Sequence, residues 1–522
     1  MPTRSIPARL RPPLCTSRAP RLLGLAVVCL LTAPEIAHAS DAGEPPPIWL
    51  VVSRPQLVDA VKPLADKRRE EGFETIISTT TVTKALAEAP RRPRYLLLVG
   101  DDEAGKKAEP WYLPSKQRRL YRWAAFQPES FASDAAWGDV DRDLVPDTAV
   151  GRIPARTAGE VEVVVKKILD FEKQPPTAQD LQLPVWAGSP MYGPMIDSSA
   201  TGLLVSSIVN GAPPWATPWI LTADTAQPFC AWPPDQVERF CRRVRMGGMC
   251  EVLIGHGDKQ AFYAMRYEDR YIRFTSERAA TQFAEGAVAP PLILLVCDAG
   301  DFTCVTPCLA ESLLFLPGGP VAAIGATTPS HPVPNYYLGQ SLLWAMGEGE
   351  TRLGDLWLKA EKHALRATSP IIERVLRDAE GKLEDPINVR KLRRDGALMY
   401  ALLGDPATRL RLPQPLRATV ERTGESWRWT AERPADATRL EIGFQPAGRP
   451  WPQLGSPPPA DREQANAALD RANAFFAFEP QAALAADKPW TGTVEQPGRL
   501  RLVAIAPGKL YVAALDLQPT AP

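Results

Sequence analysis

The sequence predicts an α/β fold, with a mainly parallel sheet and flanking helices, followed by a small β-sandwich. From about residue 47, short apolar runs alternate with helical segments, a rhythm typical of parallel strands joined by helices. Several of these runs end directly in Gly, Asp, His or Cys, as in YLLLVGDD. After residue 413 the pattern changes to short alternating runs separated by turn formers, which predicts a sandwich.

Residues 1–39 are expected to be a signal peptide. Arg18 and Arg21 precede an apolar run at 22–31, and the tripeptide AHA at 37–39 has the small-x-small pattern of a cleavage site. The apolar run is too short to cross a hydrocarbon core, which needs roughly twenty residues. We therefore expect a secreted, periplasmic or cell-envelope protein whose mature chain has no transmembrane anchor.

A first unit, an N-terminal α/β subdomain, is expected over residues 45–180. The runs IWLVVS, FETIIS and RPRYLLLVGDD are typical of buried strands, with a helix at 55–71 after the first of them. The Pro- and Trp-containing stretch 103–132 is expected to form a loop over the carboxyl edge of the sheet. Thr157 and Glu160 have the spacing of a capping box and begin another helix.

A second unit, at 181–413, carries the candidate chemistry. Its expected strands include EVLIGHGDKQAF, PPLILLVCDAGDF and PGGPVAAIGA, and LLGDPATRLRLP is expected to close it. A third unit, at 414–522, is the predicted sandwich, with strands such as SWRWTAE, RLEIGFQ and KLYVAALDL. Its Ala- and Pro-rich middle, 450–488, has no assignable pattern.

The charge balance argues against a nucleic-acid partner. The chain has 60 Lys and Arg against 60 Asp and Glu, for a formal net charge of zero. Proteins that bind nucleic acid usually carry a basic stripe, often interleaved with aromatics, and no such stripe is present.

Cys297 and His256 each follow an apolar strand, and the carboxyl edge of an α/β sheet is where ligands bind. A thiol is a nucleophile only as thiolate, and an adjacent imidazole lowers its pKa from about 8.5. The amides of Gly257 and Cys297 could together hold a developing oxyanion. The plainer alternative is a buried cysteine and a Gly-His-Gly turn. His331 and His363 are less well placed to act as the base.

The remaining cysteines leave the redox state open. An exported chain is permitted disulfides, and a bridge between Cys230 and Cys241 is plausible, with Cys250 nearby in sequence. None of the cysteine and histidine spacings predicts a zinc site.

An acidic segment suggests calcium. Asp139, Asp141, Asp143 and Asp147 could supply hard oxygen ligands to a structural ion. The segment departs from the EF-hand pattern because Leu144 stands where that loop needs Gly. A solvated acidic turn is the alternative.

The chain resembles the gingipain family of cysteine peptidases, whose catalytic unit is similar to the caspase fold. LIGHGDKQAF and VCDAGDF match the family's Gly-His-Gly and Cys-x-x-Gly-Asp-Phe blocks, and YLLLVGDD, SDAAWGD, AVGRIP and LLGDP follow in the family's order. The resemblance covers roughly residues 48–412. It implies a caspase-like sheet in two subdomains and an immunoglobulin-like sandwich after it.

The resemblance also implies the chemistry. Cys297 would be the nucleophile and His256 the general acid/base, with Gly257 and Cys297 amides as the oxyanion hole. The reaction would be hydrolysis of peptide bonds in protein or peptide substrates through an acyl-enzyme. No cofactor would be required.

One segment, AGSPMYGPMIDSSA, departs from the family pattern. Some family members have an acid here that assists the dyad, and Pro190 or Met191 occupies that place. Asp197 falls near a second family acid that binds a basic P1 side chain, which makes it a candidate for the specificity pocket. The alternative is that Asp197 caps the following helix.

Three hypotheses follow. The first is an exported cysteine endopeptidase. The second is a catalytically degenerate peptidase fold retained as a binding or scaffold module, and the third, more remote, is an acyltransferase or transpeptidase that uses the same dyad.

Overall fold

The structure is a computed structural model that describes residues 45–191, 193–283, 287–370, 372, 387–454 and 459–518. By their contacts, residues 46–522 form one compact unit. The predicted signal peptide, 1–39, lies outside the described residues.

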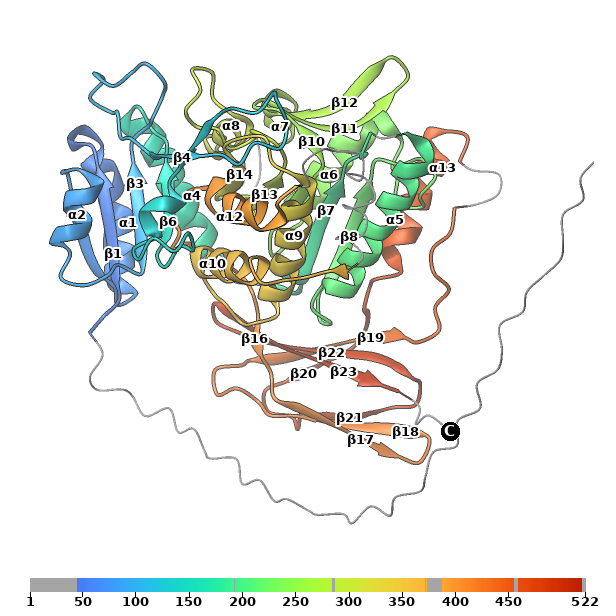
Figure 1. The fold of residues 1–522 in the computed structure, drawn as a ribbon. Helices are drawn as coiled ribbons and strands as arrows, with labels where there is room; N and C mark the ends of the chain where they lie inside the picture. The colour runs from blue at the N-terminus through green and yellow to red at the C-terminus, as the bar shows by residue number, and fades with distance from the viewer. Residues whose placement is uncertain are drawn as a thin grey trace, which may run out of the picture. The chain divides into compact units, whose positions relative to one another are not determined.

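A ten-stranded sheet forms the centre of this unit, in the order β2-β1-β3-β6-β15-β14-β13-β9-β7-β8 (Figure 1). The predicted strands IWLVVS, FETIIS and RPRYLLLVGDD are confirmed, and they contain β1, β2 and β3. In chain order the sheet strands are β1 Ile48–Ser53, β2 Glu74–Ser78, β3 Tyr95–Val99, β6 Ala149–Ile153, β7 Gln182–Ala187, β8 Thr217–Thr222, β9 Glu251–Ile254, β13 Leu292–Leu295, β14 Ala323–Ala326 and β15 Tyr400–Leu403.

The sheet is mostly parallel. Strand β15 runs antiparallel to β14, with Tyr400 opposite Ala326, and it joins the two halves of the sheet. The loop after β3 contacts the loop after β13, since the amide of Ala104 donates to the carbonyl of Thr303 at 2.9 Å. The carboxyl ends of strands from both halves therefore meet at one edge.

Two helical layers cover the sheet because side chains alternate along each strand. On β13, Leu292 and Leu294 join the hydrophobic cluster that includes side chains of α1, α4, α6, α7 and α8, whereas Ile293 and Leu295 join the cluster that includes α5, α9 and α10. The helices are α1 Val58–Glu70, α2 Val82–Glu88, α3 Ala135–Gly138, α4 Ala158–Lys173, α5 Pro194–Gly211, α6 Gln236–Arg245, α7 Ser276–Phe283, α8 Leu309–Leu314, α9 Pro332–Met346, α10 Leu353–Ala364, α12 Val389–Met399 and α13 Arg462–Ala474.

The predicted capping box is confirmed at the start of α4. The hydroxyl of Thr157 accepts from the amide of Glu160, and the Glu160 carboxylate accepts from the amide of Thr157. The stretch 103–132, expected to be a loop, contains the strand β4, Lys116–Arg119, which pairs with β5, Ser130–Ser133. Its contact with Thr303 confirms its place at the carboxyl edge.

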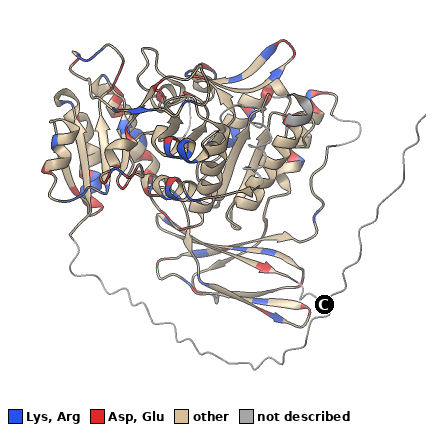
Figure 2. Ribbon diagram, viewed as in Figure 1, with Lys and Arg blue, Asp and Glu red and all other residues tan. Residues whose placement is uncertain are grey.

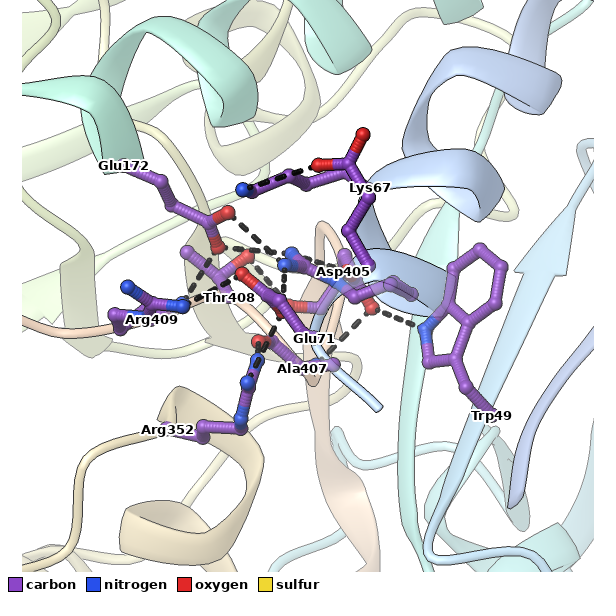
Figure 3. A network of polar contacts seen from close by, with 11 residues as sticks. Trp49, Lys67, Glu71, Glu172, Arg352, Asp405, Ala407, Thr408 and Arg409 are labelled. Atoms are coloured by element: carbon purple, nitrogen blue, oxygen red, sulfur yellow. Dashed lines mark hydrogen bonds and ion pairs between the residues drawn. The ribbon is translucent and has the colours of Figure 1, made fainter. Parts of the chain in front are cut away.

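A buried ionic network ties the end of α1 to the LLGDP segment (Figure 3). Arg68 is fully buried and lies 2.8 Å from carboxylate oxygens of both Glu172 and Asp405. Trp49 donates to Asp405 at 3.0 Å. Three guanidinium groups face three carboxylates, so the network's formal charges balance. Its charged members are Arg68, Arg352, Arg409, Glu71, Glu172 and Asp405.

After β15 the chain forms two further sheets that share one hydrophobic core. The five-stranded sheet has the order β16-β23-β22-β19-β20, and the three-stranded sheet has the order β17-β18-β21. Trp427 and Trp429 from the smaller sheet pack with Leu440 and Leu502 from the larger one. The strands are β16 Gln414–Pro415, β17 Ala418–Thr423, β18 Ser426–Ala431, β19 Arg439–Pro446, β20 Glu479–Ala485, β21 Thr491–Val494, β22 Gly498–Ala506 and β23 Lys509–Leu517.

Helix α13, in the segment that had no assignable pattern, returns to the edge strand β8 of the central sheet. The side chain of Asn473 accepts from the amide of Ile220 at 2.7 Å and donates to its carbonyl at 2.9 Å. Nearby, Asp235 accepts from Arg462 and Asn466 at 2.6 and 2.8 Å. The side-chain amide of Asn473 thus pairs with the N–H and C=O groups of Ile220 on the outer edge of β8.

Within the described part of the chain, no helix combines the length and the apolar character needed to cross a membrane. Basic and acidic positions are interspersed along the elements (Figure 2), in keeping with the zero formal net charge.

Candidate active site

His256 and Cys297 lie at corresponding positions beyond two neighbouring strands. Strands β9 and β13 are parallel, and Ile254 pairs with Leu295 as the last residue of each. His256 and Cys297 each come two residues later. Because the strands are parallel neighbours, this register brings the two side chains to the same stretch of the carboxyl edge.

The imidazole of His256 is oriented by a main-chain carbonyl. His256 and Gly257 form β10, which leaves the central sheet and pairs with β11, Ala261–Tyr267; β11 continues into β12, Arg270–Thr275. Nε2 of His256 lies 2.8 Å from the carbonyl oxygen of Pro190. A carbonyl can only accept, so Nε2 carries the hydrogen and Nδ1 keeps its lone pair. Nδ1 is therefore the nitrogen that can take a proton.

The thiol of Cys297 is half-buried and lies against Ser330. Its Sγ is 3.5 Å from the Ser330 carbonyl oxygen and 3.8 Å from the Ser330 hydroxyl oxygen. Burial raises the pKa of Cys297, and contacts from Ser330 partly offset this effect. Among the described residues, no hydrogen bond joins Sγ to the ring of His256; catalytic contacts are often longer in an unliganded site.

The turn after Cys297 is strained. Asp298 has a φ of 58°, in the left-handed region. The turn is held on both sides, because the amide of Gly300 donates to the Ala326 carbonyl and that of Ala310 to the Ala299 carbonyl, both at 2.9 Å. Burial, followed by the charge of Asp301, raises the pKa of Asp298 to about 6.

Gly257 lies where no side chain would fit. A Cβ at this position would be 2.3 Å from Cγ1 of Val296 and 2.5 Å from the carbonyl oxygen of Ala261. The backbone of Gly257 is thereby held close to the residue before Cys297. The Cys297 amide is directed toward its own sulfur, where it lowers the thiol pKa.

Lys259 and Asp301 join the two loops, a pair that sequence reasoning missed. The Lys259 ammonium lies 2.9 Å from both the Asp301 carboxylate and Sγ of Cys304. The amide of Leu309 also donates to the Lys259 carbonyl at 2.6 Å. The loop after His256 is therefore tied to the loop after Cys297. The only sequence signal was the position of these residues, a few places after each candidate catalytic residue.

The other described histidines have structural partners. Nδ1 of His331 accepts from the amide of Val333, and its ring packs edge-on against Trp123 at 5.0 Å. Burial lowers the pKa of His331 to about 4, which keeps it neutral at physiological pH. His363 contacts Ser341 at 2.9 Å and stacks on Trp344. Neither ring has a hydrogen bond to Cys297 among the described contacts.

Asp197 lies in the first turn of α5, whose N-cap is Gly193. The alternative interpretation, in which Asp197 caps this helix, is therefore wrong, because Gly193 is the N-cap residue. Its carboxylate accepts from the hydroxyl of Ser189 at 2.9 Å, and the same hydroxyl accepts from the amide of Met191. The carboxylate is fixed beside the loop that carries Pro190.

The side chains of Asp139, Asp141 and Asp143 lie together, with one oxygen of each within 4.8 Å of the others. Asp139 is buried, and its Oδ1 has no partner among the described residues. Burial, with smaller contributions from the other two charges, raises its pKa. Asp147 lies instead 3.4 Å from Arg92.

The plausible disulfide between Cys230 and Cys241 was wrong. Both are free, as are Cys250, Cys297, Cys304 and Cys308, within the described part of the chain. Burial raises the pKa of Cys230 to about 12, so this thiol is neutral and acts as a small apolar side chain.

A comparison with protein families decides the assignment. The model of peptidase family C25 matches residues 43–411, more than half of the chain. The chain belongs to peptidase family C25. It is accordingly a cysteine-type peptidase that acts on protein substrates. The resemblance to the gingipain family is confirmed.

Solved structures agree with the family C25 fold. The Arg-specific cysteine proteinase gingipain R (RgpB) has a TM-score of 0.51 and 13% identity, covering 92% of this chain and 99% of that chain. The complex of Porphyromonas gingivalis RgpB pro- and mature domains has a TM-score of 0.51 and 12% identity, covering 90% and 99%. A third chain, described as a protease, has a TM-score of 0.51 and 14% identity, covering 91% and 98%. Curated proteins yield no match.

Proposed function

We propose that the chain is an exported cysteine endopeptidase, with Cys297 as nucleophile and His256 as general acid/base. The observation that carries this proposal is the β9–β13 register, in which Ile254 pairs with Leu295 two residues before each candidate. The Pro190 carbonyl supports it, because it leaves Nδ1 of His256 free to accept the thiol proton.

In the proposed reaction, Nδ1 of His256 takes the proton from Cys297, and the thiolate attacks the scissile carbonyl. The amides of Gly257 and Cys297 donate to the oxyanion that forms. His256 then gives its proton to the leaving amine, which leaves an acyl group on sulfur. Water, deprotonated by His256, releases the acid and restores the thiol.

Three further assignments belong to the same proposal. Asp197 would bind a basic P1 side chain, which its fixed carboxylate beside the Pro190 loop supports. The C-terminal sheets would form an immunoglobulin-like sandwich, which their common core supports. Export would follow removal of residues 1–39, which the basic and apolar leader pattern supports.

A structural calcium ion is proposed at Asp139, Asp141 and Asp143. The grouping of their oxygens within 4.8 Å and the unpartnered Oδ1 of Asp139 support it. Carboxylate oxygens are the ligands that calcium prefers. The ion would stabilise the turn before β6 and take no part in hydrolysis.

The test is thiol-dependent cleavage of a mixed peptide library by the full chain. We expect Cys297→Ala to abolish cleavage and Cys304→Ala, which removes another half-buried free thiol, to retain it. Equal activity of the parent and Cys297→Ala would contradict the proposal.

A catalytically degenerate binding module is the second candidate. It is favoured by the raised pKa of Cys297 and by the neutral partner of His256. Peptide binding by the parent without any cleavage would support this second candidate. Products that gain the mass of an added amine would instead indicate acyl transfer.

A further inference from the structure

A buried polar network lies directly behind the candidate nucleophile. Ser330, Asn335 and Tyr400 are 4%, 6% and 2% exposed. The Tyr400 hydroxyl donates to Oδ1 of Asn335 at 2.8 Å, and Nδ2 of Asn335 donates to the Ser330 hydroxyl oxygen at 2.9 Å. That oxygen lies 3.8 Å from Sγ of Cys297. The network therefore ends at the sulfur.

The donors and acceptors impose a direction on this network. An amide oxygen only accepts and an amide nitrogen only donates, so Asn335 uses one group toward Tyr400 and the other toward Ser330. The Ser330 oxygen already accepts from Asn335, which leaves its own hydrogen to be donated. The sulfur of Cys297 is one acceptor near this hydrogen, and the hydroxyl oxygen of Tyr400 is a second.

Three separate elements hold the network in place. Ser330 immediately precedes His331, the N-cap of α9, and Asn335 lies in the first turn of that helix. Tyr400 begins β15 and pairs with Ala326 at the end of β14. Because all three side chains are buried and hydrogen-bonded, the Ser330 hydroxyl oxygen is held in place beside the sulfur.

The surroundings of Cys297 disfavour its thiolate, so a hydrogen bond from a neutral donor would stabilise that form. Burial disfavours the thiolate, and the nearby charge of Asp298 acts in the same direction. Asp298 is itself near Asp301, Asp258 and Lys259. Behind the sulfur, burial keeps His331 and Tyr400 neutral. His256 would become cationic once it has taken the thiol proton.

We propose that Ser330 is a positioning residue for the nucleophile, a role that rests on the proposed function. Its carbonyl accepts from the thiol, and its hydroxyl donates to the thiolate once the proton has moved to His256. Asn335 and Tyr400 hold the hydroxyl in the orientation that this requires. Ser330 keeps its own proton throughout, and no covalent bond to it forms or breaks.

The experiment measures how fast iodoacetamide alkylates Cys297 in the full chain between pH 5 and 10, by the mass of the Cys297 peptide. We expect Ser330→Ala to slow alkylation at pH 7 by about tenfold and to shift the profile to higher pH, because the thiolate loses a donor. Ser330→Thr keeps a hydroxyl and should return the rate to within about twofold of the parent.

Two further variants test the orientation of the hydroxyl. Tyr400→Phe keeps the ring and its packing but removes the donor to Asn335, and should slow alkylation at pH 7 by about threefold. Ser133→Ala is the matched control, because Ser133 is also buried and its hydroxyl donates elsewhere, to the Leu398 carbonyl at 2.6 Å. Its profile should overlap that of the parent.

Overlapping profiles for Ser330→Ala and the parent would overturn the proposal. Should Ser330→Ala fail to fold, an unshifted profile for Tyr400→Phe would overturn it equally. Failure of the proposed function is a different result, namely retained cleavage by Cys297→Ala.

Discussion

Nε2 of His256 lies 2.8 Å from the carbonyl oxygen of Pro190, which is 66 residues earlier in the chain. This contact fixes the ring and its tautomer, but it adds no negative charge beside the imidazole. An imidazolium formed during the reaction is stabilised less by a carbonyl than by a carboxylate. The Pro190 carbonyl therefore orients the imidazole of His256 and does little to stabilise a positive charge on it.

Because the contact comes from the main chain, Pro190→Ala should keep kcat/KM within about threefold of the parent. His256→Ala should lower kcat/KM by about 10²- to 10⁴-fold, the usual contribution of a general acid/base. Both are measured with a peptide chosen from the library.

His363→Ala serves as the control histidine, since that ring stacks on Trp344 and contacts Ser341. A loss in Pro190→Ala as large as that in His256→Ala would show that the proline ring, rather than its carbonyl, is what matters.

Gly257→Ala should lower kcat/KM by about 10²-fold, because the added Cβ would meet Val296 and the Ala261 carbonyl and displace an oxyanion donor. Gly159→Ala is the matched control: it lies in α4 with nothing within 4 Å of the added Cβ. It should raise stability by about 0.4–1 kcal/mol or leave it unchanged. Normal kinetics in Gly257→Ala would exclude that amide from the oxyanion hole.

Asp298→Asn should be more stable than the parent at pH 7 and equally stable below pH 4. Burial raises the pKa of Asp298 to about 6 in the folded chain, above an ordinary value of about 3.9. The folded state then holds more protons, so stability falls as pH rises between these values and is level above them. Asparagine also tolerates the left-handed backbone.

The same substitution should speed alkylation of Cys297 at pH 7 by about two- to threefold, since a charge that raises the thiol pKa is removed. Thermal unfolding from pH 3.5 to 8 and the alkylation profile provide the two measurements. Parallel stability curves for the two proteins would refute the assignment of this titration to Asp298.

Calcium should raise the melting temperature of the full chain. At a hundredfold excess over its dissociation constant, an ion that binds only the folded state stabilises by about 2.7 kcal/mol. A double variant, Asp141→Asn with Asp143→Asn, should lose the response, and Asp66→Asn, at an exposed surface pair, should keep it. A melting temperature indifferent to calcium and chelator in the parent would rule the site out.

Asp405→Ala should destabilise the chain by about 3–5 kcal/mol, because it removes a buried partner of Arg68. Asp66→Ala breaks an exposed pair with Arg69 and should leave denaturant unfolding unchanged. Similar midpoints for both variants would mean that the buried network does not support the fold.

Much of the fold could be predicted because most of the central strands are short apolar runs. The runs before His256 and Cys297 predicted neighbouring strands, and the pairing of Ile254 with Leu295 confirms that they are neighbours. The capping box of Thr157 was equally local and equally predictable.

Other features depend on contacts that leave little trace in the sequence. The Pro190 carbonyl has no side-chain signature, and Lys259 meets Asp301 only after two loops have folded. Ser330 and Asn335 lie near each other in the chain, but their relation to Cys297 depends on where β14 ends. Helix α13 was not predicted, because its segment is rich in Ala and Pro. Its role, to contact the backbone of Ile220 in β8, depends on the folded structure.

The contact of Asn473 with Ile220 has a consequence for fragments of this peptidase. A chain cut after Leu412 would retain every residue proposed for catalysis. The backbone N–H and C=O of Ile220 in β8 would, however, lose their hydrogen bonds to Asn473. An uncovered edge strand is a template for pairing with other chains. The last hundred or so residues would then decide whether the enzyme stays dispersed in solution, even though none of them takes part in its proposed chemistry.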